Sequence, residues 1–367
     1  MTEFLTEQEA TEITANYMSK EGKTSSTQEI LDSGAVPRLE GYKARPGKVS
    51  DSIFGGKFTH KGTEYENPPL TDKNGTPLRI MVRTDRISTH DINRGTIPFK
   101  DQILALNHNT MRKLVRGAMG TSQYDVQGLQ DNSVVIAAEN LQQIAVEMVI
   151  RAYMAKTTTS TSLYQAYVVR GERTFAGHKL PEGLVANGKL PHVIDTPSTK
   201  EETHDQTITP EWLYEHKICT EAQYNEMLSA ALEGFNIAGS FYSEKGVILV
   251  DTKTEHGINR KGRIVTQDEL YTMDSSRAWL RLDYNEQVEK FKRGEIPEIN
   301  PKSFSKEFAR GYSEGEKGYT DEQRALIAVR YITGIQNLLG QRFVPDLKPR
   351  DERVIAGLET VVRELVN

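Results

Sequence analysis

The sequence predicts an α+β protein with two or three lobes, and three observations lead to this prediction. The chain has 367 residues, whereas a single hydrophobic core seldom grows beyond about 250–300 residues. Residues 41–150 alternate short apolar runs with turn residues, which is typical of strands and their connections. Longer stretches with helical spacing of apolar residues appear mainly in the second half. We therefore expect an N-terminal helical extension at 1–40, an α+β lobe at 41–150 and a second α+β lobe with closing helices at 151–367.

Apolar spacing predicts the elements of the extension and the first lobe. Leu5, Ile13 and Tyr17 have the spacing of a helix, and the polar residues 22–28 that follow predict a loop. In the first lobe, short apolar runs bounded by turn residues predict strands, and one longer periodic stretch predicts a helix. The expected elements are strands at 78–82, 133–137 and 144–151 and a helix at 103–115.

The second lobe has longer helical patterns and a long polar segment. Residues 179–209 are polar and rich in turn-forming residues, so they predict a loop. Met227, Leu228 and Phe235 would lie on one face of an amphipathic helix. The remaining expected elements of this lobe are helices at 221–241, 321–339 and 349–366 and strands at 247–250 and 263–266.

Composition excludes several classes of function. The net charge is −5 with both signs interspersed, which gives no support for nucleic-acid binding, because phosphate contacts need clustered Lys and Arg. No apolar stretch approaches the roughly 20 residues of a membrane helix, and the acidic N-terminus lacks the apolar core of a signal peptide. The single cysteine, Cys219, excludes an intrachain disulfide and a cysteine-based zinc site. We therefore expect a cytoplasmic protein with no nucleic-acid partner and no membrane partner, and local patches for small phosphorylated ligands remain possible.

The most informative local pattern is an apolar run followed by alternating charges. Val247 to Val250 are four consecutive apolar residues and predict a strand that is buried on both faces. Because strand side chains alternate, Asp251, Lys253 and Glu255 would fall on one face. Three charges at the end of a buried strand are costly unless they bind ions or ligands. The alternative is a solvated strand end in which these charges pair with one another.

A second pattern lies just downstream of the strand predicted at 263–266. If this strand forms a hairpin with the one before it, Asp268 lies near Glu255, and two such carboxylates could hold Mg²⁺, which prefers oxygen ligands. The run Asp274-Ser275-Ser276-Arg277 offers hydroxyls and a guanidinium that suit a phosphate. In the absence of a ligand, the same run would be a capping or turn sequence.

Four further segments are suggestive only in combination. Gly47-Lys48-Val49 could bring backbone N–H groups close to phosphate oxygens. The polar residues Thr84 to Asp91 follow a predicted strand, where ligand-binding loops are common. The strand that contains Val146 ends at Arg151, whose guanidinium would reach either a substrate phosphate or solvent. The segment Thr196 to Lys200 has the proline and hydroxyl content of a loop.

Taken in order, these segments resemble the signature blocks of the phosphoribosylaminoimidazole-succinocarboxamide synthase (SAICAR synthetase) family. The resemblance runs from about Gly41 to Tyr312, and the segments at 196–205 and 249–277 are highly specific to that family. It implies a two-lobe fold related to ATP-grasp enzymes, with antiparallel sheets and an ATP cleft between the lobes. It also implies that the first lobe binds ATP and that the second binds substrate and metal.

The implied reaction joins L-aspartate to the imidazole carboxylate nucleotide CAIR, with conversion of ATP to ADP and phosphate, in purine biosynthesis. It would proceed through an acyl phosphate, because a carboxylate is a poor electrophile until a good leaving group is attached. The resemblance implies Mg²⁺ as cofactor, ATP as co-substrate and either a monomer or a homodimer. Two alternatives remain open on the same scaffold, namely another ATP-dependent carboxylate–amine ligase and a kinase-like phosphotransferase.

The resemblance also assigns roles to individual residues. Groups beside the reacting carboxylate and two arginines would perform catalysis, namely Asp251, Lys253, Arg151 and Arg277. Metal ligation would fall to Glu255 and Asp268. ATP would be bound by Gly47, Lys48, Val49, Glu147 and Met148. The substrate side would be lined by Asp85, Arg86, Ser88, Asp91, Lys100, Arg151, Ser198, Lys200, Asp205, Ser276 and Arg277.

Three departures from the family pattern affect these assignments. Ser50 follows Gly-Lys-Val where the family usually has Arg, so a cationic phosphate contact is either missing or supplied elsewhere. Phe99-Lys100-Asp101 stands where the family has Gly-Lys-Gly. After Arg151 the family has a short turn with Gly-Ser, whereas here both Ser160 and Ser162 are candidates for the role of that serine.

Overall fold

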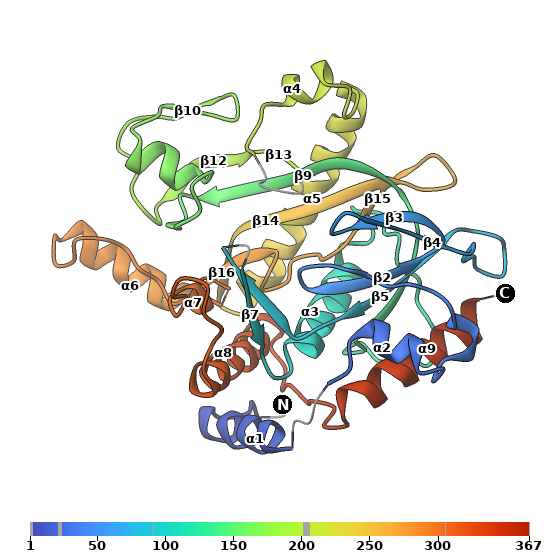
Figure 1. The fold of residues 1–367 in the computed structure, drawn as a ribbon. Helices are drawn as coiled ribbons and strands as arrows, with labels where there is room; N and C mark the ends of the chain where they lie inside the picture. Colours follow the sequence, from blue (N-terminus) through green and yellow to red (C-terminus); the bar gives the residue numbers. More distant parts are fainter. Residues whose placement is uncertain (1–2, 21–23, 91, 201–205, 305, 367) are drawn as a thin grey trace.

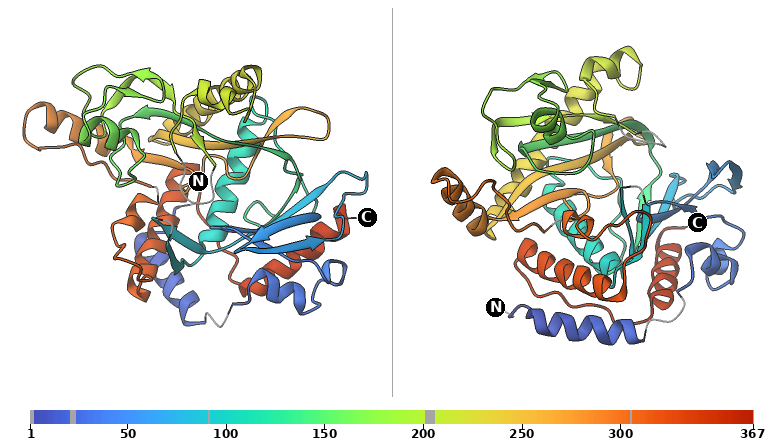
Figure 2. Two further views of the ribbon diagram at one scale, coloured as in Figure 1. Left: turned by 45° about the horizontal axis from the view of Figure 1, so that its top comes forward. Right: turned by 60° about the vertical axis from the view of Figure 1, so that its left-hand side comes forward.

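The computed structural model describes residues 3–20, 24–90, 92–200, 206–304 and 306–366, which form helices and antiparallel sheets (Figure 1). A four-stranded sheet has the order β1-β2-β5-β8. A six-stranded sheet has the path β12-β9-β14-β15, with β13 beside β9 and β16 beside β14. In both views of Figure 2 the first sheet lies to one side of the second. The predicted α+β fold class is therefore confirmed, whereas an ATP cleft remains a prediction.

The first sheet has one apolar face, which a helix from the other end of the chain covers. Ile53 and Ile80 are opposite each other in neighbouring strands and share a buried core with Val354, Leu358 and Val361. The C-terminal helix thus completes the core of the first sheet, as the proximity of red and blue segments in Figure 1 shows. The elements are β1 (Arg45–Pro46), β2 (Ser50–Phe54), β5 (Leu78–Arg83), β8 (Val135–Glu139) and α9 (Arg350–Leu365).

Two long antiparallel strands form the centre of the second sheet. They are β9 (Gln142–Tyr153) and β14 (Val247–Ile258), which pair from Asp251 opposite Arg151 to Ile258 opposite Gln142. The predicted boundary at residue 150 falls inside β9, and the division into lobes remains a prediction. The flanking strands are β12 (Lys189–Asp195), β13 (Ser198–Thr199), β15 (Ile264–Gln267) and β16 (Ser276–Leu280).

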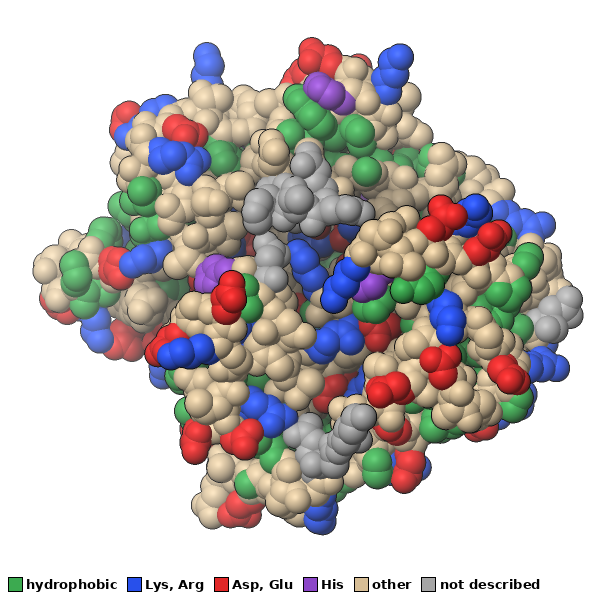
Figure 3. All heavy atoms as spheres, in the orientation of Figure 1, with side chains coloured by type: hydrophobic (Ala, Val, Ile, Leu, Met, Phe, Trp, Pro, Cys, Tyr) green, Lys and Arg blue, Asp and Glu red, His purple; other side chains and the backbone are tan. Residues whose placement is uncertain are grey.

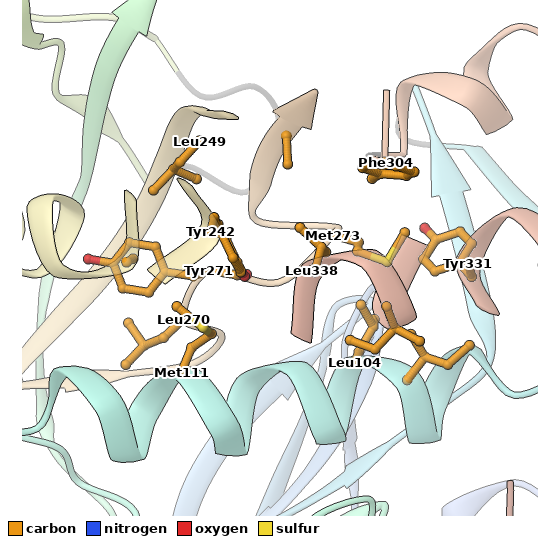
Figure 4. Close-up of a cluster of buried hydrophobic side chains, with 14 of the residues drawn as sticks. Leu104, Met111, Tyr242, Leu249, Leu270, Tyr271, Met273, Phe304, Tyr331 and Leu338 are labelled. Atoms are coloured by element: carbon orange, nitrogen blue, oxygen red, sulfur yellow. The ribbon is translucent and has the colours of Figure 1, made fainter. Parts of the chain in front are cut away.

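Three helices pack around a large hydrophobic core on one side of this sheet. They are α3 (Lys100–Val115), α5 (Glu221–Glu244) and α8 (Asp321–Leu339). Figure 4 shows Leu104 and Met111 of α3 beneath Tyr242, Leu249 and other apolar side chains of this core. The helices begin where the sequence supplies caps, since Thr220 and Thr320 each form a capping box with a glutamine three residues later. Helix α8 ends at Gly340, which has a φ of +66°.

The remaining elements are short and lie around the two sheets (Figures 1 and 2). Among the described residues, no helix is long and apolar enough to span a membrane. These elements are α1 (Glu7–Ser19), α2 (Thr27–Asp32), a 3₁₀ turn (Pro37–Leu39), β3 (Gly56–His60), β4 (Thr63–Asn67), β6 (Arg86–Thr89), β7 (Ile92–Thr96), a π-helical turn (Gln165–Val169), β10 (Thr174–Phe175), β11 (His178–Lys179), α4 (Pro210–Glu215), α6 (Arg281–Lys292) and α7 (Glu307–Arg310).

Most predicted elements are confirmed, and three predictions were wrong. The segment 179–209 is not a long loop, because it contains β12 and β13, which pair with β9. The strand predicted at 247–250 continues to Ile258, since hydrogen-bonding strands flank it on both sides and its charged residues find partners there. The loop predicted at 22–28 is shorter at its end, because Ser26 caps α2; residues 22 and 23 lie outside the described ranges.

Candidate active site on strands β9 and β14

The strand register brings three of the predicted motifs to one patch. Along β14, Asp251 is opposite Arg151 and Glu255 is opposite Glu147 of β9. On the other side of β14, Asp251 is opposite Arg277 of β16. Because alternate residues of a strand share a face, the charged side chains of β14 meet those of both neighbours on one surface. The predicted common face of Asp251, Lys253 and Glu255 is therefore present in the sheet.

Lys253 lies at the centre of a cluster of alternating charges. Its Nζ is 2.7 Å from Oε1 of Glu147 and 2.6 Å from Oε1 of Glu255. Lys200 donates to the other carboxylate oxygen of Glu255, and Ser198 Oγ donates to Glu147 Oε2 at 3.2 Å. Both carboxylates are buried. The predicted loop around Lys200 thus reaches the same cluster as the strand.

The electrostatics of this cluster keep Lys253 and Glu255 charged. Burial opposes the charge of Lys253, but Glu255 and Glu147 outweigh burial and raise the pKa of the ammonium well above its usual range. Burial would raise the pKa of Glu255, yet the ammoniums of Lys253 and Lys200 lower it to about 2. An ionised lysine is therefore fixed beside the ionised carboxylate of Glu255 at neutral pH, which is a suitable environment for stabilising charge on a transferring group.

Two arginines share the carboxylate of Asp251, which lies two residues before Lys253 on the same face of β14. Oδ2 of Asp251 is 3.1 Å from NH1 of Arg151 and 2.5 Å from NH1 of Arg277. Arg151 Nε also donates to Thr196 Oγ1 at 2.8 Å. Both guanidiniums are held in place while part of their donor capacity remains for a ligand, so this end of the patch suits an anion such as a phosphate. Ser276 is opposite Thr252 and directed to the other face of the sheet, where its buried Oγ is 2.8 Å from Thr252 Oγ1.

Asp268 lies directly after the hairpin strand that pairs with β14. Gln267 is opposite Glu255, which confirms the predicted hairpin and the closeness of Asp268 to Glu255. The carboxylate of Asp268 is exposed and makes no hydrogen bond or ion pair with any residue that the structure describes. Although Asp268 has an exposed surface, the protein around its carboxylate partly desolvates it, and this desolvation together with the Glu255 charge raises its pKa to about 6. Asp268 also has a φ of +62°, a strained value that is found preferentially at functional sites.

The turn Gly47-Lys48-Val49 is tied to the loop that follows β5. A Cβ on Gly47 would lie 2.4 Å from the carbonyl oxygen of Ser50, so only glycine fits there. Arg86 donates to the carbonyl of Gly47 at 2.8 Å and pairs with Asp51 at 2.5 Å. The N–H of Thr84 donates to the carbonyl of Val49 at 2.9 Å. Two of the predicted segments therefore form one local structure.

Several predicted site residues lie outside this patch or outside the described residues. Lys100 is fully buried, with Nζ 2.8 Å from Asp274 Oδ2. Asp85 is buried 3.5 Å from Nε of Arg350. The side chain of Met148 belongs to the hydrophobic core, so only its backbone is left for a contact with a nucleotide. Asp91 and Asp205 lie outside the described residues, and Ser88 is half-buried in β6.

The structure also shows contacts, and one further residue, Glu307, that the sequence patterns did not indicate. Thr196 positions Arg151, and Glu307 lies 4.0 Å from Nε of Arg277. Both contacts join segments that are distant in sequence, so no local signal could have indicated them. Of the two candidate serines, Ser162 is buried and accepts from the N–H of Gln165 at 3.2 Å, whereas Ser160 is exposed.

The face drawn in Figure 3 is hollowed near its centre, and Lys and Arg side chains gather there with some acidic ones. The described residues contain no group of three or more His, Cys, Asp or Glu side chains that could hold a metal ion. Mg²⁺ is often held by only one or two carboxylates together with nucleotide phosphates and water. The oxygen donors of Glu255 and Asp268 fit that type of site, although Glu255 is also paired with two lysines.

Comparisons with known proteins agree on one family. The family description "SAICAR synthetase" matches residues 71–326. A putative phosphoribosylaminoimidazole-succinocarboxamide synthase 2 from Agrobacterium fabrum is 32% identical, over 86% of this chain and 93% of its own length. A phosphoribosylaminoimidazole-succinocarboxamide synthase from Legionella pneumophila is 35% identical, over 83% and 95% respectively.

Solved structures of similar fold carry the same description. SAICAR-synthase from Saccharomyces cerevisiae complexed with SAICAR has a TM-score of 0.65 and 22% identity, over 88% of this chain and 99% of that chain. A SAICAR synthetase in complex with ADP has a TM-score of 0.56 and 18% identity, over 83% of this chain and 100% of that chain. At these identities the likeness shows a shared fold.

Proposed function

The chain belongs to the SAICAR synthetase family, and from this premise we propose that the patch on β9 and β14 is where it activates a carboxylate with ATP. The protein is an ATP-dependent ligase of purine biosynthesis, which joins L-aspartate to CAIR and releases ADP and phosphate. The two alternative activities considered from the sequence receive no support from the named relatives. The observation that carries the proposal is the ammonium of Lys253, which lies between the buried carboxylates of Glu147 and Glu255.

The chemistry requires a cation where phosphate is transferred. A free carboxylate resists attack by an amine, so one of its oxygens first takes the γ-phosphoryl group of ATP. The amine of aspartate then attacks the acyl carbon, and phosphate leaves with that oxygen. Negative charge on the phosphoryl oxygens is the main barrier, and a fixed ammonium stabilises it without reorganisation. Lys253 is the ionised residue that we assign to this role, with Asp251 beside the reacting carboxylate.

The arginine pair supplies the anchoring for the substrate. Arg151 and Arg277 are held by Asp251 and present remaining N–H donors, which suits the ribose phosphate of CAIR. The family resemblance also assigns Ser276 to the substrate, although its side chain hydrogen-bonds to Thr252 on the other face of the sheet. The other residues that the family resemblance assigns to the substrate side keep that assignment as a proposal: Asp85, Arg86, Ser88, Asp91, Lys100, Ser198, Lys200 and Asp205.

The nucleotide would bind between the two sheets. The turn Gly47-Lys48-Val49 would cover its phosphates with backbone N–H groups and the Lys48 ammonium. Glu147 and the backbone of Met148 would lie near the adenine. Glu147 has a second contact, with Lys253, so it links the nucleotide end of β9 to the proposed transfer site.

A metal ion is part of this proposal. Glu255 and Asp268 would hold Mg²⁺, which when bound neutralises charge on the nucleotide phosphates. The exposed and unpaired carboxylate of Asp268 is the feature of this chain that best suits a cation. The two lysines that flank Glu255 keep its carboxylate ionised and therefore available as an oxygen ligand.

The test is a coupled assay of ADP release by the full chain. We expect ADP only when ATP, CAIR and L-aspartate are all present, and we expect stoichiometric free phosphate. ADP release without aspartate, together with a stable phosphorylated CAIR, would indicate a phosphotransferase instead. ADP release that depends on a different amine or carboxylate would indicate another ligase.

A further inference from the structure

The face of the first sheet that does not pack against α9 carries an arginine with no assigned role. Ile80 and Val82 of β5 point into the core, so Arg79, Met81 and Arg83 point to the opposite side. Arg83 crosses from this side to the second sheet, where it pairs with Glu269, the residue after Asp268. This face of β5 is therefore directed toward the loop that carries the proposed metal carboxylate.

Arg79 is restrained on this face but its polar atoms are not satisfied. It is opposite Phe54 in the strand register, and its guanidinium carbon lies 5.1 Å from the centre of the Phe54 ring. Its Nε is buried without a hydrogen-bond partner. Within the part of the chain that the structure describes, Arg79 forms no hydrogen bond or ion pair. A half-buried guanidinium in this state costs free energy unless a ligand supplies acceptors.

The charges around Arg79 indicate what such a ligand would be. Burial and the neighbouring Arg45 lower the pKa of Arg79, whereas the carboxylates of Asp268 and Glu255 raise it. Arg79 and Asp268 are thus close enough to interact but form no direct pair. A cation alone would satisfy Asp268 and leave Arg79 without acceptors, while an anion alone would do the reverse. A polyphosphate that carries a divalent cation satisfies both residues.

We propose that Arg79 binds the terminal phosphate of the metal-bound nucleoside triphosphate, from the side opposite Asp268. The identity of the triphosphate as ATP rests on the proposed function. The terminal phosphate is the one concerned, because Asp268 and Glu255 would hold the divalent cation that neutralises the phosphate being transferred, and the charges of both carboxylates act on Arg79. The neighbouring positions on the same face of β2, Ser50 and Ser52, carry no charge, so Arg79 supplies a cation that β2 does not.

Calorimetric titration of the full chain with ATP, ADP and AMP, each in excess Mg²⁺, tests this assignment. Arg79→Met should weaken ATP binding by about tenfold or more, since it removes a charge-assisted contact, and should leave AMP binding within about twofold. Arg79→Lys should recover part of the loss. Arg116→Met removes a charge from an exposed position at the end of α3 and should change nothing.

The outcomes separate this inference from the proposed function. Failure of the wild type to bind ATP would contradict the proposed function itself. Binding of ATP to Arg79→Met with wild-type affinity would overturn the role of Arg79 alone. Equal losses for ATP and AMP would also overturn it, because the contact would then lie at the nucleoside. If Arg79→Met does not fold, the ATP-to-AMP ratio of losses in Arg79→Lys decides in the same way.

Discussion

Replacing Lys253 with methionine removes one charge from the centre of the buried cluster and keeps most of the side-chain volume. The ammonium lies 2.7 Å from Glu147 and 2.6 Å from Glu255, and the carboxylate side chains are only 10% and 5% exposed. Removal of one partner from a buried ion pair costs about 3–5 kcal/mol. Because Lys200 still pairs with Glu255 and Ser198 still donates to Glu147, we expect a loss near the low end, about 3 kcal/mol.

Thermal unfolding and turnover measure the two consequences separately. With about 2 cal/mol/K of unfolding entropy per residue, this loss lowers the Tm by about 4 °C for cooperative unfolding. Turnover should fall by at least about 10²-fold while ATP binding is retained, because the ammonium acts on the transferring phosphoryl group.

The matched control for this prediction is Lys290→Met. Lys290 has an ion pair of the same length, 2.6 Å to Glu286, but here the side chains of Lys290 and Glu286 are 40% and 65% exposed. An exposed pair of this kind contributes little to stability because water and salt screen it, and it lies outside the proposed site. If Lys253→Met is no less stable and no less active than Lys290→Met, the reasoning about the cluster is refuted.

Four further substitutions, in three predictions, test other parts of the site. Glu255→Gln and Asp268→Asn should each lower turnover by about 10²-fold with an unchanged circular dichroism spectrum, and near-normal turnover at limiting Mg²⁺ would exclude them as metal ligands. Arg277→Lys should raise the KM for CAIR by about tenfold and that for ATP by less than about twofold, since lysine lacks the forked donor geometry; equal effects on both would place Arg277 elsewhere. Burial and the charge of Asp101 raise the pKa of Asp85 to about 7 in the folded protein, despite the nearby Arg350. In the unfolded chain this carboxyl has its ordinary, lower pKa and loses its proton at a lower pH than in the folded protein. The folded protein therefore loses stability as the pH rises toward about 7. Asp85→Asn should therefore gain in Tm relative to the wild type between about pH 4 and about pH 8, and a constant difference in Tm over that range would contradict the buried, protonated state.

The sequence alone predicted the central strand and the common face of its charged side chains. The apolar run at Val247 and the period of two that follows it predicted a common face for Asp251, Lys253 and Glu255, and the register with β9 bears this out. The hairpin that brings Asp268 near Glu255 could be predicted for the same reason, since both strands are local and separated by a short turn. Periodicity and short-range turns are the signals that a single sequence carries most reliably.

Contacts between distant segments could not be predicted from one sequence. The pairing of Glu147 with Lys253 depends on the antiparallel register of two strands about a hundred residues apart. The strands β12 and β13 were missed because they have few apolar residues and gain their hydrogen bonds from β9. The cover of the first sheet by α9 likewise joins opposite ends of the chain, and no local pattern specifies which sheet a C-terminal helix will cover.

The central claim is that this chain activates the carboxylate of CAIR by phosphoryl transfer before nitrogen attacks. The most direct measurement uses CAIR labelled with ¹⁸O in its imidazole carboxylate, with ATP, aspartate and the wild-type protein. Because the leaving phosphate takes one carboxylate oxygen with it, mass spectrometry should find one ¹⁸O in each inorganic phosphate formed. If the phosphate contains no label while the amide product accumulates, the acyl-phosphate route is wrong, and the role assigned to Lys253 fails with it.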